Sequence, residues 1–226
     1  MIHKNNIPQY TPQEETANVV THSFGILLSL ISLVILIFYS LKTNSLVCLV
    51  SSIIFALSML ILYSASTLYH SCKINPDILS HSVRKKNLRI FDHSSIYILI
   101  SGSYTPFLLI PFHNHLSYFI CAGLWICSLI CISLKLFFVN SFKILSTLSY
   151  VAMGWTALFI LKSLYHSVPL SAFSFIILGG IFYTSGVYFY LKKKVEYYHA
   201  IWHLFVLAGS LSHVIALIFI LKNMSA

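Results

Sequence analysis

Residues 199–203 read His199-Ala-Ile-Trp-His203, and they begin an apolar run that continues to Leu221. Side chains four positions apart lie on one face of an α-helix, so both imidazoles can bind the same metal ion. In a soluble protein such a pair more often hydrogen-bonds a neighbouring helix. Inside a membrane span, however, ionisable side chains are costly to bury and are functional by default. The stretch therefore predicts a metal site at the start of a transmembrane helix.

The composition is that of an integral membrane protein. Of the 226 residues, 58% are hydrophobic and only 8% are charged, which is too few charges for a soluble domain. The formal net charge is +9, but the basic residues fall in short segments between apolar runs, a placement that sets membrane topology. We therefore expect no nucleic-acid partner. The five cysteines match no metal or disulfide spacing and are expected to be small apolar filler.

Intervals between charged residues locate the membrane spans, since each span needs about 20 mostly apolar residues. The interval 93–134 is long enough for two spans, and two prolines and a His-Asn-His turn divide it. We expect an all-α integral membrane protein with one domain over residues 1–226, a seven-transmembrane helix bundle preceded by a short polar tail at 1–11. The seven helices are predicted at 22–41, 46–70, 92–110, 117–137, 143–161, 169–190 and 198–221.

The segment Thr11-Pro12-Gln13-Glu14 predicts where the first helix begins. Threonine is placed as the N-cap, proline as the first helical residue and glutamate at the third position, as in a capping box. From there Glu14, Asn18 and His22 recur every four residues and form a polar stripe that leads into the apolar run. The first twenty residues are too polar for a cleavable signal peptide, so the first span is expected to direct insertion itself.

The basic residues also indicate the orientation of the bundle. With the N-terminus inside, only Lys42, Lys162 and Lys222 of the 14 Lys and Arg residues lie outside. Because basic loops stay on the cytoplasmic side, we expect a cytoplasmic N-terminus and an external C-terminus. This topology places the polar residues of four segments within about two helical turns, or roughly 10 Å, of the cytoplasmic membrane face. They are His22, Ser66, His70, Asp92, His199 and His203.

Three of these residues are candidate metal ligands. His70, His199 and His203 with an open fourth position suit Zn²⁺, whose catalytic sites commonly combine three protein ligands with a water. Imidazole ligands alone also suit iron, nickel or copper. Bound zinc lowers the pKa of its water to about 7, which supplies a hydroxide nucleophile at neutral pH.

Two further residues are candidates for catalysis. Asp92 is expected to hold that water, to act as general base or to ligate the metal, although an acidic residue here also simply caps the third helix. Ser66 lies one turn before His70 and is placed to donate a hydrogen bond to a developing oxyanion or to a ligand. Serine is also common in membrane spans for packing alone.

The polar stripe of the first helix is expected to surround the ligands. Glu14, Asn18 and His22 would orient the ligands or line a water-filled entry, although Glu14 alternatively anchors the helix at the interface. His213 follows His203 by ten residues, which places it roughly 15 Å deeper. His213 is therefore predicted to be a buried hydrogen-bonding residue and not a ligand.

Together these motifs resemble the progestin and adipoQ receptor family, and in particular its bacterial haemolysin III-like branch. The resemblance is carried by Glu14-x-x-x-Asn18-x-x-x-His22-x-x-Gly25, Ser66-x-x-x-His70, Asp92-His93-Ser94 with Gly102-Ser103-Tyr104-Thr105-Pro106, and His199-x-x-x-His203 with His213. It implies a seven-helix bundle with zinc near the cytoplasmic face, His70, His199 and His203 as ligands and Asp92 at or near the zinc-bound water. It also implies kinship with membrane hydrolases that include alkaline ceramidases, and a location in the bacterial plasma (inner) membrane.

The sequence therefore leads to one main functional hypothesis and several alternatives. The main hypothesis is a zinc-dependent, ceramidase-like hydrolase of lipid amide or ester bonds that uses a metal-activated water. The alternatives are a membrane sensor, receptor or regulator of lipid homeostasis with structural zinc, and a haemolysin-like cytolytic protein or channel. A metal transporter would space its ligands across the bilayer, and the clustering at one face argues against it. The expected partners are the lipid bilayer and a membrane lipid as substrate or ligand, and the sequence identifies no protein partner.

Overall fold

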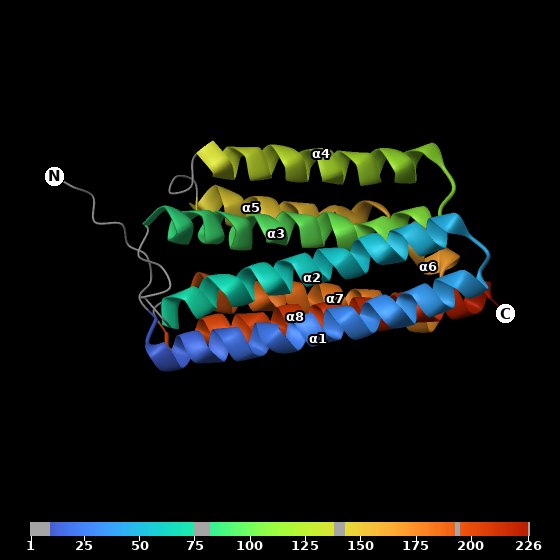
Figure 1. Cartoon of the computed structure of the whole chain (residues 1–226). Helices are drawn as coiled ribbons and strands as arrows, with labels where there is room; N and C mark the ends of the chain where they lie inside the picture. Colours follow the sequence, from blue (N-terminus) through green and yellow to red (C-terminus); the bar gives the residue numbers. More distant parts are fainter. Residues whose placement is uncertain (1–9, 75–81, 138–142, 193–194, 226) are drawn as a thin grey trace.

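The computed structural model describes residues 10–74, 82–137, 143–192 and 195–225 (Figure 1). Within these ranges the chain is helical and contains no strand. The helices are α1 (Pro12–Lys42), α2 (Leu46–Ile74), α3 (Ser82–Leu109), α4 (His115–Phe137), α5 (Lys143–Gly154), the 3₁₀ turn η2 (Trp155–Phe159), α6 (Leu161–Ser167), α7 (Leu170–Leu191) and α8 (Tyr198–Met224). Six of the seven predicted ranges lie within single helices to within one residue, whereas the range 143–161 covers α5, η2 and the start of α6. The all-helical prediction is confirmed for the described residues.

Helix α1 begins where the capping motif predicted. The Thr11 hydroxyl accepts a hydrogen bond from the Glu14 backbone N–H at 3.2 Å, and the Glu14 carboxylate accepts one from the Thr11 N–H at 2.8 Å. The helix then runs without a break for 31 residues, about 46 Å at 1.5 Å per residue. It is therefore longer than the roughly 30 Å hydrocarbon core of a bilayer, and its first polar turns can extend beyond that core.

The helices lie side by side along one direction in an elongated bundle (Figure 1). Consecutive helices pack as neighbours from α1 to α4, and α8 packs between α7 and α1. α1 begins at one end of the bundle and α8 ends at the other (Figure 1). The end where α1 begins also holds the last turn of α2 and the first turns of α3 and α8, so segments distant in sequence meet there.

Within the described part of the chain, five helices are long and apolar enough to cross a membrane: α1, α2 over Leu46–Cys72, α4, α7 and α8. A sixth span results if the bent pair Ser146–Phe159 and Leu161–Ser167 counts as one. The chain is thus a multi-pass membrane protein. Its lipid-facing surface is apolar and its interior is partly polar, because α1 buries His22, Ser29 and Ser32 while exposing Phe24, Val34 and Phe38 on its other faces.

The predicted continuous helix at 143–161 is wrong, because this segment breaks after Gly154. The chain continues through η2, and the bend of 54° lies at Ile160, between Ser146–Phe159 and α6. The Tyr104 hydroxyl of α3 donates to the Gly154 carbonyl at 2.5 Å and accepts from the Ala157 N–H at 2.7 Å. The Tyr104 side chain thus inserts between helical turns and bonds two backbone groups where the helical hydrogen-bond pattern is interrupted.

Helix α3 is more polar than a typical span and does not meet the same length and hydropathy test. Its polar side chains are enclosed by other helices, since α3 packs against both α2 and α4. Ser101 lies 2.7 Å from Ser128 of α4, and Gly102 lies so close to Ser58 of α2 that a Cβ would collide with the serine. Helices in membranes pack closely through small residues of this kind. α3 is therefore an interior helix, held by small polar residues on both sides.

Candidate metal centre

His70, His199 and His203 meet at the end of the bundle where α1 begins. His70 lies in the last turns of α2, and His199 and His203 lie in the first turns of α8. One ring nitrogen from each lies within 4.8 Å of the other two. His70 and His203 are fully buried, and His199 is half-buried. The three residues that the sequence analysis chose as ligands are thus the ones that the fold brings together.

The spacing of the rings suits a metal ion. The Nε2 atoms of His70 and His199 are 3.3 Å apart. Zinc with nitrogen ligands at about 2.0–2.1 Å in tetrahedral geometry separates two of them by about 3.3 Å. The same distance also permits a weak hydrogen bond between the two rings. The partners of the other ring nitrogens decide between a metal site and a hydrogen-bonded pair.

The Nδ1 atom of His70 is occupied by a carboxylate. Oε2 of Glu15 lies 2.5 Å from it, and the Asn18 amide donates to the same carboxylate oxygen at 3.3 Å. A carboxylate on one ring nitrogen holds the proton there and leaves Nε2 as the lone-pair atom, as in carboxylate–histidine–metal arrangements. Glu15 and Asn18 therefore prepare His70 to act as a ligand through Nε2.

His203 is oriented by the first helix. Its Nδ1 lies 3.2 Å from the Thr21 hydroxyl of α1. Its Nε2 is buried and has no hydrogen-bond partner. A buried polar atom without a partner calls for an explanation, and a metal ion held by Nε2 of His203 and its two neighbours supplies one. The donor set therefore fits a divalent transition metal.

Two aromatic rings enclose the cluster. His22 stacks on His203 with 3.6 Å between ring centroids, and both ring nitrogens of His22 are buried without a hydrogen-bond partner. Tyr10 stacks on His199 with centroids 5.1 Å apart. Burial, and then the nearby Glu15 carboxylate, raise the pKa of the Tyr10 hydroxyl, so this residue remains a neutral phenol. Their side chains shield the histidines on two sides.

The structure separates the roles of two adjacent glutamates. Glu14, which the sequence analysis placed beside the ligands, bonds Thr11 in the helix cap and accepts the backbone N–H of Tyr197 at 3.1 Å. Tyr197 has φ 59° and directly precedes α8, so Glu14 ties the start of α8 to α1. Glu15, which the sequence analysis passed over, is the carboxylate that contacts a ligand ring. Glu15 lies three residues before Asn18 and so on the same helix face, and this spacing could have identified Glu15 from the sequence.

The two predicted catalytic residues lie at the same end of the bundle as the histidines. Ser66 is buried one turn before His70 on α2, and Asp92 is buried on α3. Asp92 is near enough to Tyr69 and Tyr190 to interact electrostatically with both rings. The group of described ligand atoms that lie within 4.8 Å of one another contains the three histidines and not Asp92. His213, as predicted, lies elsewhere, with Nε2 3.3 Å from the Ile176 carbonyl oxygen.

Fold and site together define a multi-pass helical membrane protein with a buried three-histidine cluster that can hold a metal ion. The chain belongs to the haemolysin III-related family, whose sequence profile matches residues 10–214. This confirms the resemblance to the bacterial branch that the motifs indicated.

Individual relatives agree with this assignment. The chain is 45% identical over 201 residues to the hemolysin-3 homolog of Bacillus subtilis (strain 168), covering 89% of this chain and 91% of that protein. It is 41% identical over 198 residues to hemolysin-3 of Bacillus cereus, with 88% and 87% covered. It is 25% identical over 221 residues to the monocyte to macrophage differentiation factor of Homo sapiens, with 92% and 84% covered. The similarity thus extends from bacterial haemolysin III proteins to a distant animal relative.

Proposed function

We propose that this protein is a zinc-dependent membrane hydrolase that cleaves an amide or ester bond of a lipid. The observation that carries the proposal is the orientation of the candidate ligands: Glu15 contacts Nδ1 of His70 and Thr21 contacts Nδ1 of His203, which leaves Nε2 of both rings available to a metal ion. The described residues supply three such nitrogens. Three protein ligands with an open position are typical of catalytic zinc, whereas structural zinc has four.

The residues around the cluster have distinct tasks in this proposal. Zn²⁺, when bound, lowers the pKa of a water to about 7 and so makes hydroxide available at neutral pH. Asp92 accepts a proton at its carboxylate and later returns it to the leaving group. The Ser66 hydroxyl donates to the carbonyl oxygen of the substrate as negative charge develops there. A lipid substrate would enter sideways, because the site lies within a bundle that has an apolar outer surface.

The topology that goes with this function has seven crossings. We count α5, η2 and α6 as one broken span and α3 as an enclosed span. The opposite positions of the start of α1 and the end of α8 support an odd number of crossings (Figure 1). The excess of basic residues at the end with the histidines supports a cytoplasmic location for that end. We propose the bacterial plasma (inner) membrane as the location, because the chain is a multi-pass membrane protein with bacterial relatives.

The bacterial relatives are named hemolysins, which makes cell lysis the second candidate function. Release of a dye from liposomes by the purified protein tests it directly. Lysis that persists in the His199→Ala/His203→Ala variant would separate the lytic activity from the metal site. A sensor or receptor with structural zinc, the other alternative, predicts that Asp92→Asn leaves lipid binding intact and that no substrate is turned over.

The decisive experiment combines metal content with turnover. Detergent-purified protein is loaded with Zn²⁺, its metal content is measured by mass spectrometry, and ceramide, N-acyl lipids and lysolipids are offered as substrates. We expect turnover by the wild type, with Asp92→Asn retaining the metal and losing at least about a hundredfold in rate, in the range of general acid–base catalysis. Absence of turnover of all three classes by folded, zinc-loaded protein would overturn the hydrolase proposal.

A further inference from the structure

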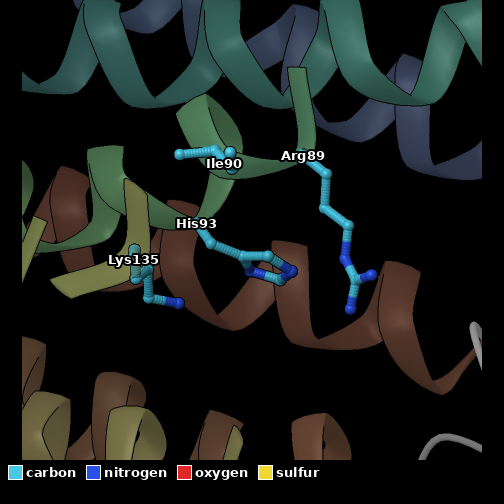
Figure 2. A pocket seen from close by; sticks show the side chains of 4 residues that line it. All are labelled: Arg89, Ile90, His93 and Lys135. Carbon is cyan, nitrogen blue, oxygen red and sulfur yellow. The ribbon is translucent and has the colours of Figure 1, made fainter. Parts of the chain in front are cut away.

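A second polar site lies at the same end of the bundle as the histidine cluster. It is a small pocket lined by Arg89, Ile90 and His93 of α3 and by Lys135 in the last turn of α4 (Figure 2). Figure 2 shows the His93 ring extending between the other two basic side chains, with a ring nitrogen directed toward the Arg89 guanidinium. Three of the four lining residues thus carry nitrogen donors, and the fourth is apolar.

The basic side chains are drawn into the bundle and do not simply point to water. Arg89, His93 and Lys135 are each only half-exposed. The Lys135 ammonium lies 5.4 Å from the centroid of the Tyr150 ring and 6.0 Å from that of Tyr97. A lysine at the end of a membrane helix would ordinarily extend its ammonium group outward to the interface. Its inward position concentrates positive charge at the pocket.

The walls of the pocket are well anchored. The Tyr150 hydroxyl of α5 donates to the His93 backbone carbonyl at 2.8 Å, and the Tyr97 hydroxyl lies 2.8 Å from that of Ser149. These contacts join α3 to α5 behind the pocket, while Lys135 reaches in from α4. The donors are therefore held by three helices, which makes their arrangement specific and not a chance meeting of flexible side chains.

The charge of the pocket favours an anion. Asp92 follows Arg89 by three residues on α3, so its carboxylate lies on the same face of that helix. Among the residues that the structure describes, the pocket thus combines a guanidinium and an ammonium with this one carboxylate, so positive charge is in excess. Guanidinium and ammonium groups bind phosphate through short, charge-assisted hydrogen bonds, and the fork of an arginine suits two phosphate oxygens at once.

We propose that the pocket of Arg89, His93 and Lys135 binds the phosphate group of an anionic phospholipid. Basic pockets between membrane helices hold the head groups of anionic lipids, and this pocket lies at the ends of α3 and α4, where a head group would reach it. The proposal is independent of the metal and of hydrolysis. Inorganic phosphate shares the same chemistry, so the test distinguishes the two sources.

The test is lipid binding to the full chain by native mass spectrometry in detergent, with phosphatidylglycerol and phosphatidylcholine titrated separately. We expect the wild type to prefer phosphatidylglycerol. Loss of a hydrogen bond to a charged group weakens binding about tenfold or more, so Arg89→Gln/Lys135→Gln should weaken phosphatidylglycerol binding by about a hundredfold. The matched control Lys86→Gln/Lys192→Gln removes the same charge from exposed positions at the same end and should bind as the wild type does.

Further arms cover the remaining outcomes. If inorganic phosphate displaces phosphatidylglycerol from the wild type but does not displace phosphatidylcholine, the pocket binds phosphate from either source, free or in a lipid. If inorganic phosphate does not compete, the lipid is the ligand. Equal loss in both double variants, or full binding by Arg89→Gln/Lys135→Gln, would overturn the proposal. If the double variant loses its helical circular dichroism signal, lipid binding by the single variant Arg89→Lys and the preference of the wild type for phosphatidylglycerol decide instead. A wild type without preference for phosphatidylglycerol also overturns it.

Discussion

Oε2 of Glu15 and Nδ1 of His70 lie 2.5 Å apart, although the two residues are separated by 55 positions in the chain. The contact joins the first turns of α1 to the last turns of α2. It gives the first helix a direct influence on a metal ligand, because the carboxylate determines which ring nitrogen of His70 carries the proton. The amino-terminal helix thus contributes to the candidate metal centre and is not only a membrane anchor.

The first prediction concerns this carboxylate. Glu15→Gln removes the charge that holds the proton on Nδ1 of His70, and loss of such an outer partner typically weakens metal affinity by about 10–100-fold. Zinc titration against a competing chelator measures the effect. Glu196→Gln is the control, since Glu196 is exposed. Equal affinities of wild type and Glu15→Gln would show that Glu15 does not orient a ligand.

The second prediction concerns the ligands themselves. His199→Ala/His203→Ala removes two of three donors, so the purified variant should contain no stoichiometric metal, whereas the wild type should contain one ion per chain. Mass spectrometry of metal content checks this. His166→Ala is a suitable control, because His166 is exposed in α6 and lies outside the three-histidine group. A folded wild type that stays metal-free after zinc resupply would assign the histidines to packing.

The third prediction concerns the support of His22. Gly25 lies against the ring of Tyr63, with which a Cβ would collide, and Tyr63 in turn packs edge-on against His22 at 5.2 Å. Gly25→Ala should therefore destabilise the protein by about 1–3 kcal/mol, as overpacking does. Thermal unfolding in detergent measures the change.

Gly123→Ala is the matched control for this substitution. Gly123 also lies inside a helix, but nothing lies within 4 Å of the position where its Cβ would be. Without a collision, replacing glycine by alanine in a helix is neutral or stabilises by about 0.5–1 kcal/mol. If the two variants unfold at the same temperature, the close approach of Gly25 and Tyr63 contributes nothing to stability.

The fourth prediction concerns the broken span. Tyr104→Phe removes both hydrogen bonds at the break between α5 and η2 and leaves the Gly154 carbonyl and the Ala157 N–H without this partner. Backbone groups without a partner cost about 1–3 kcal/mol each in an apolar environment, and the bilayer offers no water to replace the lost hydrogen bonds. A clear fall in the thermal midpoint is therefore expected. Tyr165→Phe, an exposed tyrosine in α6, should leave the midpoint unchanged.

The sequence by itself determined the class of this protein and the identity of the candidate ligands. Apolar run lengths are a direct consequence of bilayer thickness, and a histidine pair at i and i+4 shares a helix face in any helix. The start of α1 was equally local, because a capping box involves only neighbouring residues. These features were predictable because their physical causes lie within one segment.

The tertiary structure decided which residues of different helices touch. Glu14 and Glu15 are neighbours on the same helical turn, so their spacing does not tell which partner each one meets. The packing of α2 and α8 against α1 brings Glu15 into contact with His70 and Glu14 into contact with Tyr197. The role of Thr21 beside His203, the break after Gly154 and the inward turn of Lys135 were decided in the same way. A helix fixes the direction of each of its side chains relative to the others, but the partner that a side chain meets depends on the rotation and depth of the neighbouring helix. These are set by the packing of the whole bundle.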